Sequence, residues 1–361
     1  MLSPKVMHVR STLGLYGAEK VLLNIAGSSN SKNISFFLIE GVTKQSSKLR
    51  KKLFSQHNKV ESYQSNSKLD FNIVSNIKRC VRYNNIEIIH THDYKSLVLA
   101  SLAMFFSEVK IVHHIHGSLG NTRSEKIYAL IEKIFMLRAN CIITVSNEQR
   151  LCLKQNILIT SKVQQINNGT PLSDSVHKSK IERSFLSLIM VARFTPEKNH
   201  KMAFDTIRDL IRAGVNIELK LLGDGETMLD MIDYVKAIKI SEHVEFLGFQ
   251  DNVDYYIKKS DALLITSKTE GLPMAMLEAM ASGVAIISTP VGEIPNIIQA
   301  SCGGFIAKSQ SELLDTLSKL YRQPEELLDA GEKAKIYLEQ HLSVTAQVKN
   351  LNQIYRGLVS A

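Results

Sequence analysis

The stretch Glu270-Gly-Leu-Pro-Met-Ala-Met-Leu-Glu278 follows directly on residues 262–265, an apolar run with the length of a buried strand. Gly271 lets the backbone turn tightly, and Pro273 suits the first position of a helix. The pattern therefore predicts a strand, a turn and a helix over residues 273–281. A helix that begins at the carboxyl end of a strand presents unpaired N–H groups and a positive dipole end, and such a helix end can bind a diphosphate.

The same alternation of short apolar strands and amphipathic helices runs through both halves of the 361-residue chain, and it predicts parallel sheets. Strands are expected at residues 5–10, 35–39, 87–91, 110–114, 141–145, 186–192, 217–222, 244–246, 262–265 and 285–288. Three further helices are expected at residues 309–322, 324–340 and 345–358. The fold class that we expect is α/β, with two Rossmann-like, doubly wound domains facing each other across a cleft and with helices at the C-terminus.

A polar stretch that begins at Asn167-Asn-Gly-Thr-Pro171 divides the chain almost in half and has the composition of a linker. We therefore expect an N-terminal domain over residues 1–170, a linker over 171–183 and a C-terminal domain over 184–342. The last helix, within residues 343–361, is expected to pack back on the N-terminal domain.

The composition, with 44% hydrophobic and 22% charged residues, is typical of a soluble globular protein. The longest apolar run, near residues 97–106, is about half as long as a membrane span requires, and the N-terminus has no apolar signal core. The four cysteines are scattered without metal-ligand spacing, which favours free thiols in a reducing compartment. We therefore expect a cytoplasmic protein.

The charge is unevenly distributed. Residues 1–178 carry 24 Lys and Arg against 11 Asp and Glu, a net charge of +13, whereas residues 179–361 carry 20 against 24, a net charge of −4. A basic half indicates an anionic partner. Nucleic acid is disfavoured because Trp is absent and no aromatic stacking platform appears. An anionic membrane surface and an anionic lipid-linked acceptor both fit, and the basic stretch Lys48-Leu-Arg-Lys-Lys-Leu-Phe54 is either a solvated helix face or a contact with lipid headgroups.

Polar residues that suit a sugar nucleotide follow several expected strands. Arg193 and Lys198 come after residues 186–192, at the edge of the sheet where ligands of such folds bind. A guanidinium and an ammonium there can neutralise a leaving diphosphate without magnesium, although two solvated surface cations are the alternative. Glu270 lies just ahead of the expected helix and Glu278 lies about 7.5 Å into it along the axis, and their carboxylates can accept hydrogen bonds from sugar hydroxyls.

The order and spacing of these motifs resemble those of glycosyltransferase family four. The resemblance rests in the second half on Arg193…Lys198, Gly223-Asp-Gly225 and Glu270-x7-Glu278. In the first half it includes Gly14-Leu-Tyr-Gly17-Ala-Glu19, His90-Thr-His92-Asp93, His116-Gly117, Val145-Ser146 and Asn168-Gly169. One departure is that Leu15 and Tyr16 separate the two glycines that are adjacent in the family, so either Gly14 or Gly17 is expected to contact phosphate.

The resemblance implies a retaining glycosyltransferase of the GT-B fold. Arg193 and Lys198 would bind the diphosphate, Glu278 the ribose, and Glu270 the transferred sugar, with His116 near the reacting face of that sugar. The other donor contacts implied are Gly14, Gly17, Gly223, Gly248, Phe249, Gly271, Leu272 and Pro273, and the acceptor contacts are Glu19 and His92. The donor would be a nucleotide-diphosphate sugar, with UDP favoured, and the acceptor a glycan or lipid-linked saccharide of the cell envelope.

Other functions fit the sequence less well. His90 and His92 share a strand face beside Asp93, but no third metal ligand is apparent, so we expect neither a metal ion nor an organic cofactor. A nucleotide-sugar epimerase would need acid and base carboxylates in both halves. A non-catalytic nucleotide-sugar-binding protein would not need to stabilise a leaving diphosphate. An NAD-linked oxidoreductase is disfavoured because no G-x-G-x-x-G joins a strand to a helix.

Overall fold

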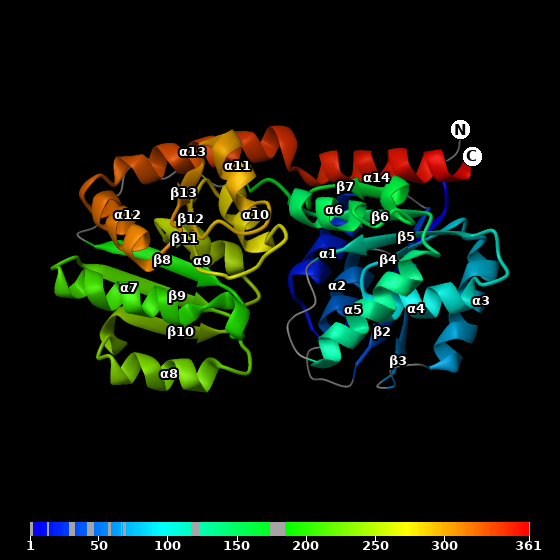
Figure 1. Ribbon diagram of the computed structural model, residues 1–361, viewed down its shortest axis with the longest axis horizontal. Coiled ribbons are helices and arrows are strands. Elements are labelled where there is room, and N and C mark those ends of the chain that lie inside the picture. The colour runs from blue at the N-terminus through cyan, green and yellow to red at the C-terminus, as the bar shows by residue number, and fades with distance from the viewer. Residues whose placement is uncertain are drawn as a thin grey trace. The chain divides into compact units, whose positions relative to one another are not determined.

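The computed structural model describes residues 3–12, 14–28, 33–41, 47–56, 59–65, 67, 70–116, 123–173 and 185–360. The chain forms two compact units, of which unit 1 comprises residues 1–169 and 344–361 and unit 2 comprises residues 170–343 (Figure 1). Residues 174–183 of the expected linker lie outside the described residues. No helix in the described part of the chain is long and apolar enough to cross a membrane.

Unit 1 is built around a parallel sheet in the order β3-β2-β1-β4-β5-β6-β7. Its strands are β1 (Val6–Thr12), β2 (Ile34–Glu40), β3 (Val60–Gln64), β4 (Ile88–Thr91), β5 (Lys110–Ile115), β6 (Cys141–Thr144) and β7 (Val163–Gln165). Its helices are α1 (Gly17–Ser28), α2 (Ser47–Gln56), α3 (Phe71–Asn84), α4 (Tyr94–Ala103), α5 (Arg123–Met136), α6 (Asn147–Lys154), the short η1 (Thr160–Lys162) and α14 (Val344–Val359).

Unit 2 has a parallel sheet in the order β10-β9-β8-β11-β12-β13. Its strands are β8 (Leu186–Val191), β9 (Ile217–Leu222), β10 (Val244–Gly248), β11 (Ala262–Ile265), β12 (Ala285–Ser288) and β13 (Gly304–Ile306). Its helices are η2 (Pro196–Lys198), α7 (His200–Arg212), α8 (Met228–Ala237), η3 (Ser241–His243), α9 (Val253–Lys259), α10 (Met274–Ala281), α11 (Ile294–Ser301), α12 (Gln310–Arg322) and α13 (Glu325–His341).

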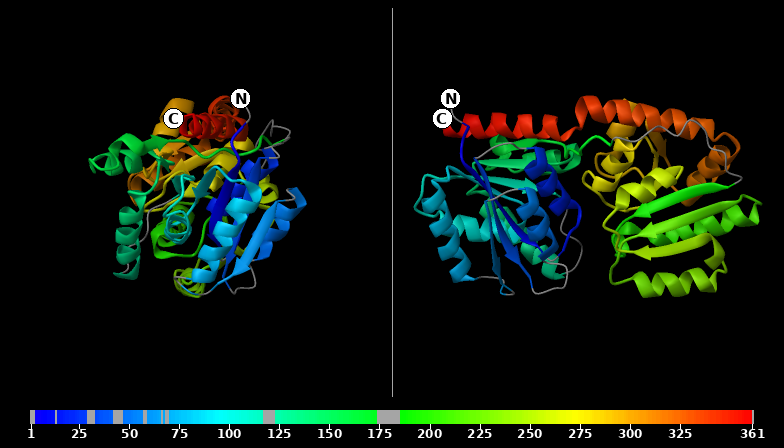
Figure 2. Two further views of the ribbon diagram at one scale, coloured as in Figure 1. Left: turned by 90° about the vertical axis from the view of Figure 1, so that its right-hand side faces the viewer. Right: turned by 180° about the vertical axis from the view of Figure 1, so that it is seen from behind.

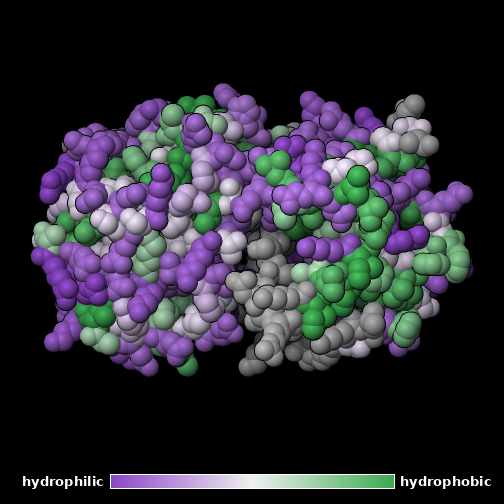
Figure 3. Space-filling model, in the orientation of Figure 1, coloured by the Kyte–Doolittle hydropathy of each residue, from purple (hydrophilic) through white to green (hydrophobic). Residues whose placement is uncertain are grey.

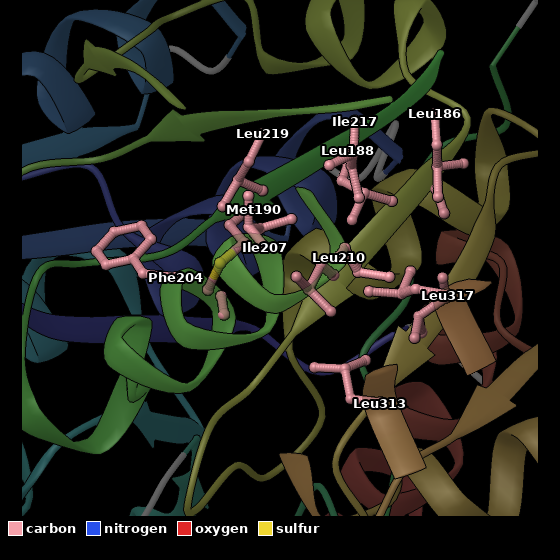
Figure 4. Close-up of a cluster of buried hydrophobic side chains, with 14 of the residues drawn as sticks. Leu186, Leu188, Met190, Phe204, Ile207, Leu210, Ile217, Leu219, Leu313 and Leu317 are labelled. Carbon is pink, nitrogen blue, oxygen red and sulfur yellow. The ribbon is translucent and has the colours of Figure 1, made fainter. Parts of the chain in front are cut away.

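Helices cover both faces of each sheet, as the right-hand view of Figure 2 shows for each unit. Strands that are buried on both faces read as continuous apolar runs, and β2 and β11 are buried along their whole length. One face of the unit 2 sheet packs on α7 and α12. Leu188 and Leu219 from the strands meet Ile207 and Leu210 of α7 and Leu317 of α12 (Figure 4).

Local signals fix the helix ends. The Asp70 side chain accepts a hydrogen bond from Asn72 N at the start of α3, and Asn85 ends that helix in the left-handed conformation at a φ of 51°. Asp93 and Ser96 form a capping box at the start of α4.

The predicted α/β class, with two doubly wound parallel sheets and helices at the C-terminus, is confirmed, and all ten predicted strands are present with ends that shift by at most two residues. Strands β3, β7 and β13 were not predicted from the sequence. These three lie at sheet edges and are short and largely polar or only half-buried, so they lack the apolar run that the prediction depends on.

In each sheet the strand order reverses at one point, between β1 and β4 in unit 1 and between β8 and β11 in unit 2. Ligands of doubly wound sheets bind at the carboxyl ends of the two strands at such a point. The loops that follow these four strands carry most of the side chains singled out from the sequence.

The last helix, α14, belongs to unit 1. It contacts α1, and its Gln347 side chain accepts a hydrogen bond from Gly169 N at 3.1 Å. Tyr355 is 2% exposed, and its hydroxyl lies 2.5 Å from His90 Nδ1 on β4. Burial, and secondarily Cys141, raises the pKa of Tyr355 well above its ordinary value of 10, so the phenol keeps its proton and can donate it to His90.

Candidate active site

Lys198 and Glu270, which lie 72 residues apart in sequence, meet at the carboxyl edge of the unit 2 sheet. Lys198 Nζ lies 2.7 Å from Glu270 Oε1, and the two side chains are only 17% and 11% exposed. Ser267 Oγ donates to the same carboxylate oxygen at 2.7 Å. These contacts hold the ammonium in one place. An ammonium fixed in this way can stabilise an anion without first being reoriented.

Backbone contacts join the loops that carry this pair. Lys198 ends η2, the short helix after β8, and Thr266 Oγ1 at the end of β11 donates to Lys198 O at 3.2 Å and to Asn199 O at 3.0 Å. Lys268 N donates to Glu197 O at 2.8 Å. The loops after β8 and β11 therefore form one structure at the switch point of unit 2.

Arg193 lies at the start of the same loop and is more exposed. Its Nη2 atom is 3.6 Å from Glu197 Oε1, and its side chain is 54% exposed. An exposed pair of this kind contributes little to stability, so the guanidinium can exchange this partner for an anionic ligand.

Two glycines let the loop after β9 approach the loop after β8. Gly223 has a φ of +143°, and a Cβ added at this residue would lie 1.9 Å from Ala192 O. A Cβ added at Gly225 would lie 2.4 Å from Phe194 O. Phe194 N donates to Asp224 O at 2.8 Å, and Gly223 N donates to Gly248 O at 2.8 Å. Gly223 and Gly248 are thus brought to the edge that carries Arg193.

The segment from Glu270 to Glu278 forms a turn followed by a short helix, as predicted, with one correction. Pro273 is the N-cap residue, with extended backbone, and α10 begins at Met274. Pro273 was expected inside the helix because its fixed φ suits a first helical position. Leu272 is buried and Glu278 is half-buried.

The turn after Glu270 depends on a glycine from another loop. Gly292 has a φ of +57°, and a Cβ at this residue would lie 2.3 Å from Gly271 O and 2.5 Å from Glu270 O. The next residue, Glu293, donates from its backbone N to Gly271 O at 2.9 Å. The backbone after β12 therefore supports Glu270 and Gly271 directly.

His200, two residues after Lys198 at the start of α7, was not among the site residues predicted from the sequence. Its ring stacks on Phe194 with 4.3 Å between centroids and 8° between planes. Burial, with a smaller contribution from Lys198, lowers the pKa of His200 to about 4. A neutral ring at this position adds no positive charge beside the ammonium.

Unit 1 contains five histidines on one face of its sheet. They are His8 on β1, His90 and His92 at β4, and His114 and His116 at β5. The first four are at most 2% exposed, and His116 is half-buried. Burial, followed by repulsion from neighbouring rings, lowers the pKa of His90, His92 and His116 well below 6.5 and that of His114 to about 3.

Three of these rings form a hydrogen-bonded chain. His8 Nδ1 lies 2.9 Å from His92 Nε2, and His92 Nδ1 lies 2.8 Å from His116 Nε2. A neutral imidazole donates from one nitrogen and accepts at the other, so the protons of both bonds point in the same direction along the chain. The tautomers of His8 and His92 therefore determine whether His116 Nδ1 is a donor or an acceptor.

The histidines also form two groups whose ring nitrogens lie within 4.8 Å of one another, His8 with His90 and His92, and His92 with His114 and His116. The fold thus brings three histidines together in each group, so each contains the third potential metal ligand that was not apparent from the sequence. His8 and His114 were missed because their position beside β4 depends on strand order and register, with His8 paired to His90. The ring nitrogens of His92 already face His8 and His116 at hydrogen-bond distance.

The loop after β1 is held by a buried ion pair. Glu19 on α1 is 1% exposed, and its Oε1 accepts from Arg10 Nε at 3.0 Å while its Oε2 accepts from Tyr16 N at 3.1 Å. Arg10 Nη1 also donates to His92 O at 2.6 Å. Glu19, predicted as an acceptor contact, therefore has its carboxylate engaged in shaping the Gly14–Gly17 turn. Gly117 lies outside the described residues.

The buried histidines predict a marked loss of stability in acid. The unfolded chain takes up protons on these rings as the pH falls through about 6.5, whereas folded His114 does so only near pH 3. Each proton of difference lowers the free energy of unfolding by about 1.4 kcal/mol per pH unit. We expect Tm to be constant between pH 8 and 7 and to fall steadily below 6.5, as measured by circular dichroism.

Two variants provide the control for this prediction. His114→Phe should flatten the fall in Tm below pH 6.5, because one buried titrating ring is removed. His341→Phe, at an exposed position on α13, should leave the fall unchanged. Equal Tm values for the unaltered protein at pH 5 and pH 7.5 would contradict the prediction.

Family models match both units of the chain. Residues 17–174 match the model described as Glycosyltransferase Family 4, and residues 175–337 match the model described as Glycosyl transferases group 1. The chain belongs to glycosyltransferase family 4. This confirms the family that the motifs predicted, and it makes the protein a glycosyltransferase that uses a nucleotide sugar.

Individual relatives of this glycosyltransferase are distant. The UDP-Gal:alpha-D-GlcNAc-diphosphoundecaprenol alpha-1,3-galactosyltransferase of Escherichia coli is 24% identical over 256 residues, which are 66% of each chain. The N-acetyl-alpha-D-glucosaminyl L-malate synthase of Bacillus anthracis is 27% identical over 304 residues, 79% of this chain and 78% of the relative. The crystal structure of Anabaena Alr3699/HepE in complex with UDP-glucose matches with a TM-score of 0.82 at 17% identity over 99% of both chains, which shows that the two share a fold.

Proposed function

We propose that this glycosyltransferase moves a hexose from a UDP-sugar, with retention of anomeric configuration, to a hydroxyl of a glycan or lipid-linked saccharide in the synthesis of cell-envelope polysaccharide. The reaction requires no metal ion and no organic cofactor. The observation that carries the proposal is the contact between Lys198 and Glu270 at the switch point of unit 2, beside Arg193 and before α10.

In this proposal the protein itself neutralises the diphosphate. Lys198 and Arg193 supply two positive charges, and the first backbone N–H groups of α10 point to the same edge of the sheet. Charge that develops on the leaving UDP is stabilised most by donors that are already in place. The restrained ammonium of Lys198 meets this condition better than the exposed guanidinium of Arg193, so we assign Lys198 the larger share.

The two glutamates bind the rest of the donor. Glu278 accepts hydrogen bonds from the ribose hydroxyls, and Glu270 accepts them from the transferred sugar and stabilises positive charge at its reacting carbon. Gly271, Leu272 and Pro273 place backbone beside the sugar and the phosphate. His116 of unit 1 contacts the transferred sugar, and the hydrogen-bonded chain through His92 determines which proton state it offers.

Two relatives support the choice of substrates. The name of the Escherichia coli relative specifies a UDP-galactose donor and a diphosphoundecaprenol-linked acceptor, and the Anabaena structure contains UDP-glucose. By extension, this chain would also use a UDP-sugar donor and a lipid-linked acceptor. It would act at the inner face of the cell membrane, which it contacts through its basic N-terminal half.

The basic stretch of residues 48–54 fits the solvated-face interpretation better than membrane insertion. It forms α2, whose Leu49 and Leu53 are completely buried. Arg50 Nε lies 3.3 Å from Glu40 Oε1. Leu49 and Leu53 therefore anchor α2 in the core of unit 1, while the Phe54 side chain, which is 50% exposed, reaches the surface.

Calorimetric titration with UDP-, GDP- and ADP-sugars tests the donor assignment. We expect a UDP-sugar to bind, and Glu278→Ala to weaken binding about 10- to 100-fold, because a hydrogen bond to a charged group contributes about 1.5–3 kcal/mol. Glu312→Ala, which removes an exposed glutamate from the first turn of α12, is the matched control and should bind like the unaltered protein.

Proton NMR of the first product formed tests retention, since the anomeric coupling of the new glycosidic bond should match that of the donor. An inverted product, or unchanged donor binding in Glu278→Ala, would refute this assignment. Interconversion of the free nucleotide sugar without transfer would indicate an epimerase instead.

A further inference from the structure

Eight large apolar side chains of unit 1 are 43–96% exposed and belong to three neighbouring segments. We call them the α5 apolar surface, and they are Phe105, Phe106, Ile127, Leu130, Ile134, Leu137, Ile157 and Leu158. In the space-filling view, hydrophobic residues gather over α5, in contrast to the mixed surface elsewhere on that face of the unit (Figure 3).

The three segments are connected by contacts at the end of α5. Ile127, Leu130 and Ile134 are spaced by three or four residues, so they form one stripe on α5, and Leu137 follows directly after the end of the helix. Arg138 Nη2 donates to Phe105 O at 3.2 Å, and the guanidinium lies 5.1 Å from the centre of the Phe105 ring. Lys162 Nζ donates to Leu137 O at 3.0 Å.

This stripe is not required for the core of unit 1, because a different face of α5 already packs there. Met136 is 2% exposed and belongs to the core cluster, and Glu132 Oε1 lies 3.1 Å from His113 Nε2 on β5. The exposed stripe is therefore additional apolar surface. Contiguous exposed patches of this kind mark contacts with another protein or with a membrane.

The charges beside the surface favour an anionic bilayer over a second copy of the chain. From residue 105 to residue 162, which spans the three segments, the sequence carries eight Lys and Arg and four Glu, and one of the glutamates, Glu132, faces His113. Arg138 and Lys162 lie directly among the apolar residues. A symmetric dimer would pair this basic, apolar surface with a copy that carries the same excess of cations, whereas on a bilayer the cations meet lipid phosphates while the apolar side chains enter the acyl region.

We propose that unit 1 docks on an anionic lipid bilayer through the α5 apolar surface, with Phe105, Phe106 and the outer face of α5 inserted and Arg138 and Lys162 at the headgroups. This deepens the membrane contact in the proposed function, since a lipid-linked acceptor is presented at the same surface. The contact is a different one from the basic stretch on α2, whose Leu49 and Leu53 are buried.

Vesicle co-sedimentation tests the docking. The unaltered protein should bind vesicles of phosphatidylcholine with one quarter phosphatidylglycerol, and bind phosphatidylcholine alone much less. The double variant Leu130→Glu/Ile134→Glu should bind the anionic vesicles at least 10-fold more weakly. The control Phe71→Glu/Tyr83→Glu places the same two charges at exposed apolar positions on α3 and should bind like the unaltered protein.

Hydrogen exchange of the unaltered protein gives an answer that does not depend on variants. On anionic vesicles, exchange should slow across residues 104–109, 127–138 and 156–162 and stay unchanged in unit 2. Equal vesicle binding by Leu130→Glu/Ile134→Glu and the control, or no slowing over α5, would overturn the proposal. A dimer by sedimentation velocity that this variant dissociates would assign the surface to a second copy instead.

Activity on two kinds of acceptor separates this inference from the proposed function. Leu130→Glu/Ile134→Glu should keep its UDP-sugar affinity and its turnover of a detergent-soluble, short-chain acceptor, and should lose turnover only of an acceptor embedded in vesicles. Failure of the unaltered protein to use a UDP-sugar would refute the proposed function, while the vesicle and exchange results would still decide the docking.

Discussion

Lys198→Ala is expected to lower kcat by about 10²–10³-fold, the cost of removing one preorganised group that stabilises charge in a transition state. The ammonium is held 2.7 Å from Glu270 Oε1 and is 17% exposed, so neither solvent nor a neighbouring cation can take its place without rearrangement. Because the charge on UDP grows as the glycosidic bond breaks, the loss should appear mainly in kcat and less in KM. Steady-state kinetics on the UDP-sugar that binds in the donor screen measures both constants.

A matched control separates this effect from the loss of an ion pair as such. Lys319→Ala removes the partner of Glu326, also at 2.7 Å, on the exposed side of α12, and it should leave kcat unchanged. Arg193→Ala should lower kcat less than Lys198→Ala, since the guanidinium is 54% exposed. Turnover of Lys198→Ala within threefold of the unaltered protein would show that the leaving group is stabilised elsewhere.

Gly292→Ala is expected to destabilise unit 2 by about 3 kcal/mol and to abolish donor binding. The residue has a φ of +57°, and an added Cβ would lie 2.3 Å from Gly271 O and 2.5 Å from Glu270 O. Backbone strain at such an angle and overpacking each cost about 1–3 kcal/mol. Since the two carbonyls belong to the turn that carries Glu270, any relief of the clash moves the carboxylate away from Lys198. Urea unfolding and calorimetry with UDP measure the two effects.

Gly214→Ala is the control for backbone strain alone. Gly214 has a φ of +82° in the turn between α7 and β9, and an added Cβ would have no atom within 4 Å. This variant should lose about 1–2 kcal/mol, as expected for a left-handed residue with a side chain, and should bind UDP normally. Equal losses in stability and donor binding for the two variants would show that the contact with Glu270 and Gly271 has no special role.

Much of the fold follows from the sequence because apolar runs and helix signals are local. The strand at residues 217–222 is predicted to the residue, since its apolar run is bounded by the turn residues Gly214 and Gly223. The edge strands β3 and β7 were missed. Only Val60 and Val163 are buried in them, and pairing with a neighbour, which the sequence does not display, defines the rest.

The candidate site is predictable in part for the same reason. Parallel strands place all their following loops at one edge, so Lys198 and Glu270 could be assigned to one region before their contact was known. The histidine group of unit 1 could not be predicted in this way, because β1 ends at Thr12 and β4 begins at Ile88. These two strands become neighbours only through the reversal of strand order. The roles assigned to these residues in binding and catalysis remain predictions.

Titration of UDP into the protein in the presence of EDTA distinguishes side chains from a divalent ion as the groups that hold the diphosphate. If Lys198, Arg193 and the first turn of α10 neutralise the diphosphate, the Kd for UDP should be the same in EDTA as in magnesium, and the double variant Arg193→Ala/Lys198→Ala should bind at least 10-fold more weakly in both. Binding that disappears in EDTA and returns with magnesium would contradict the account, because a divalent ion would then hold the diphosphate in place of these side chains.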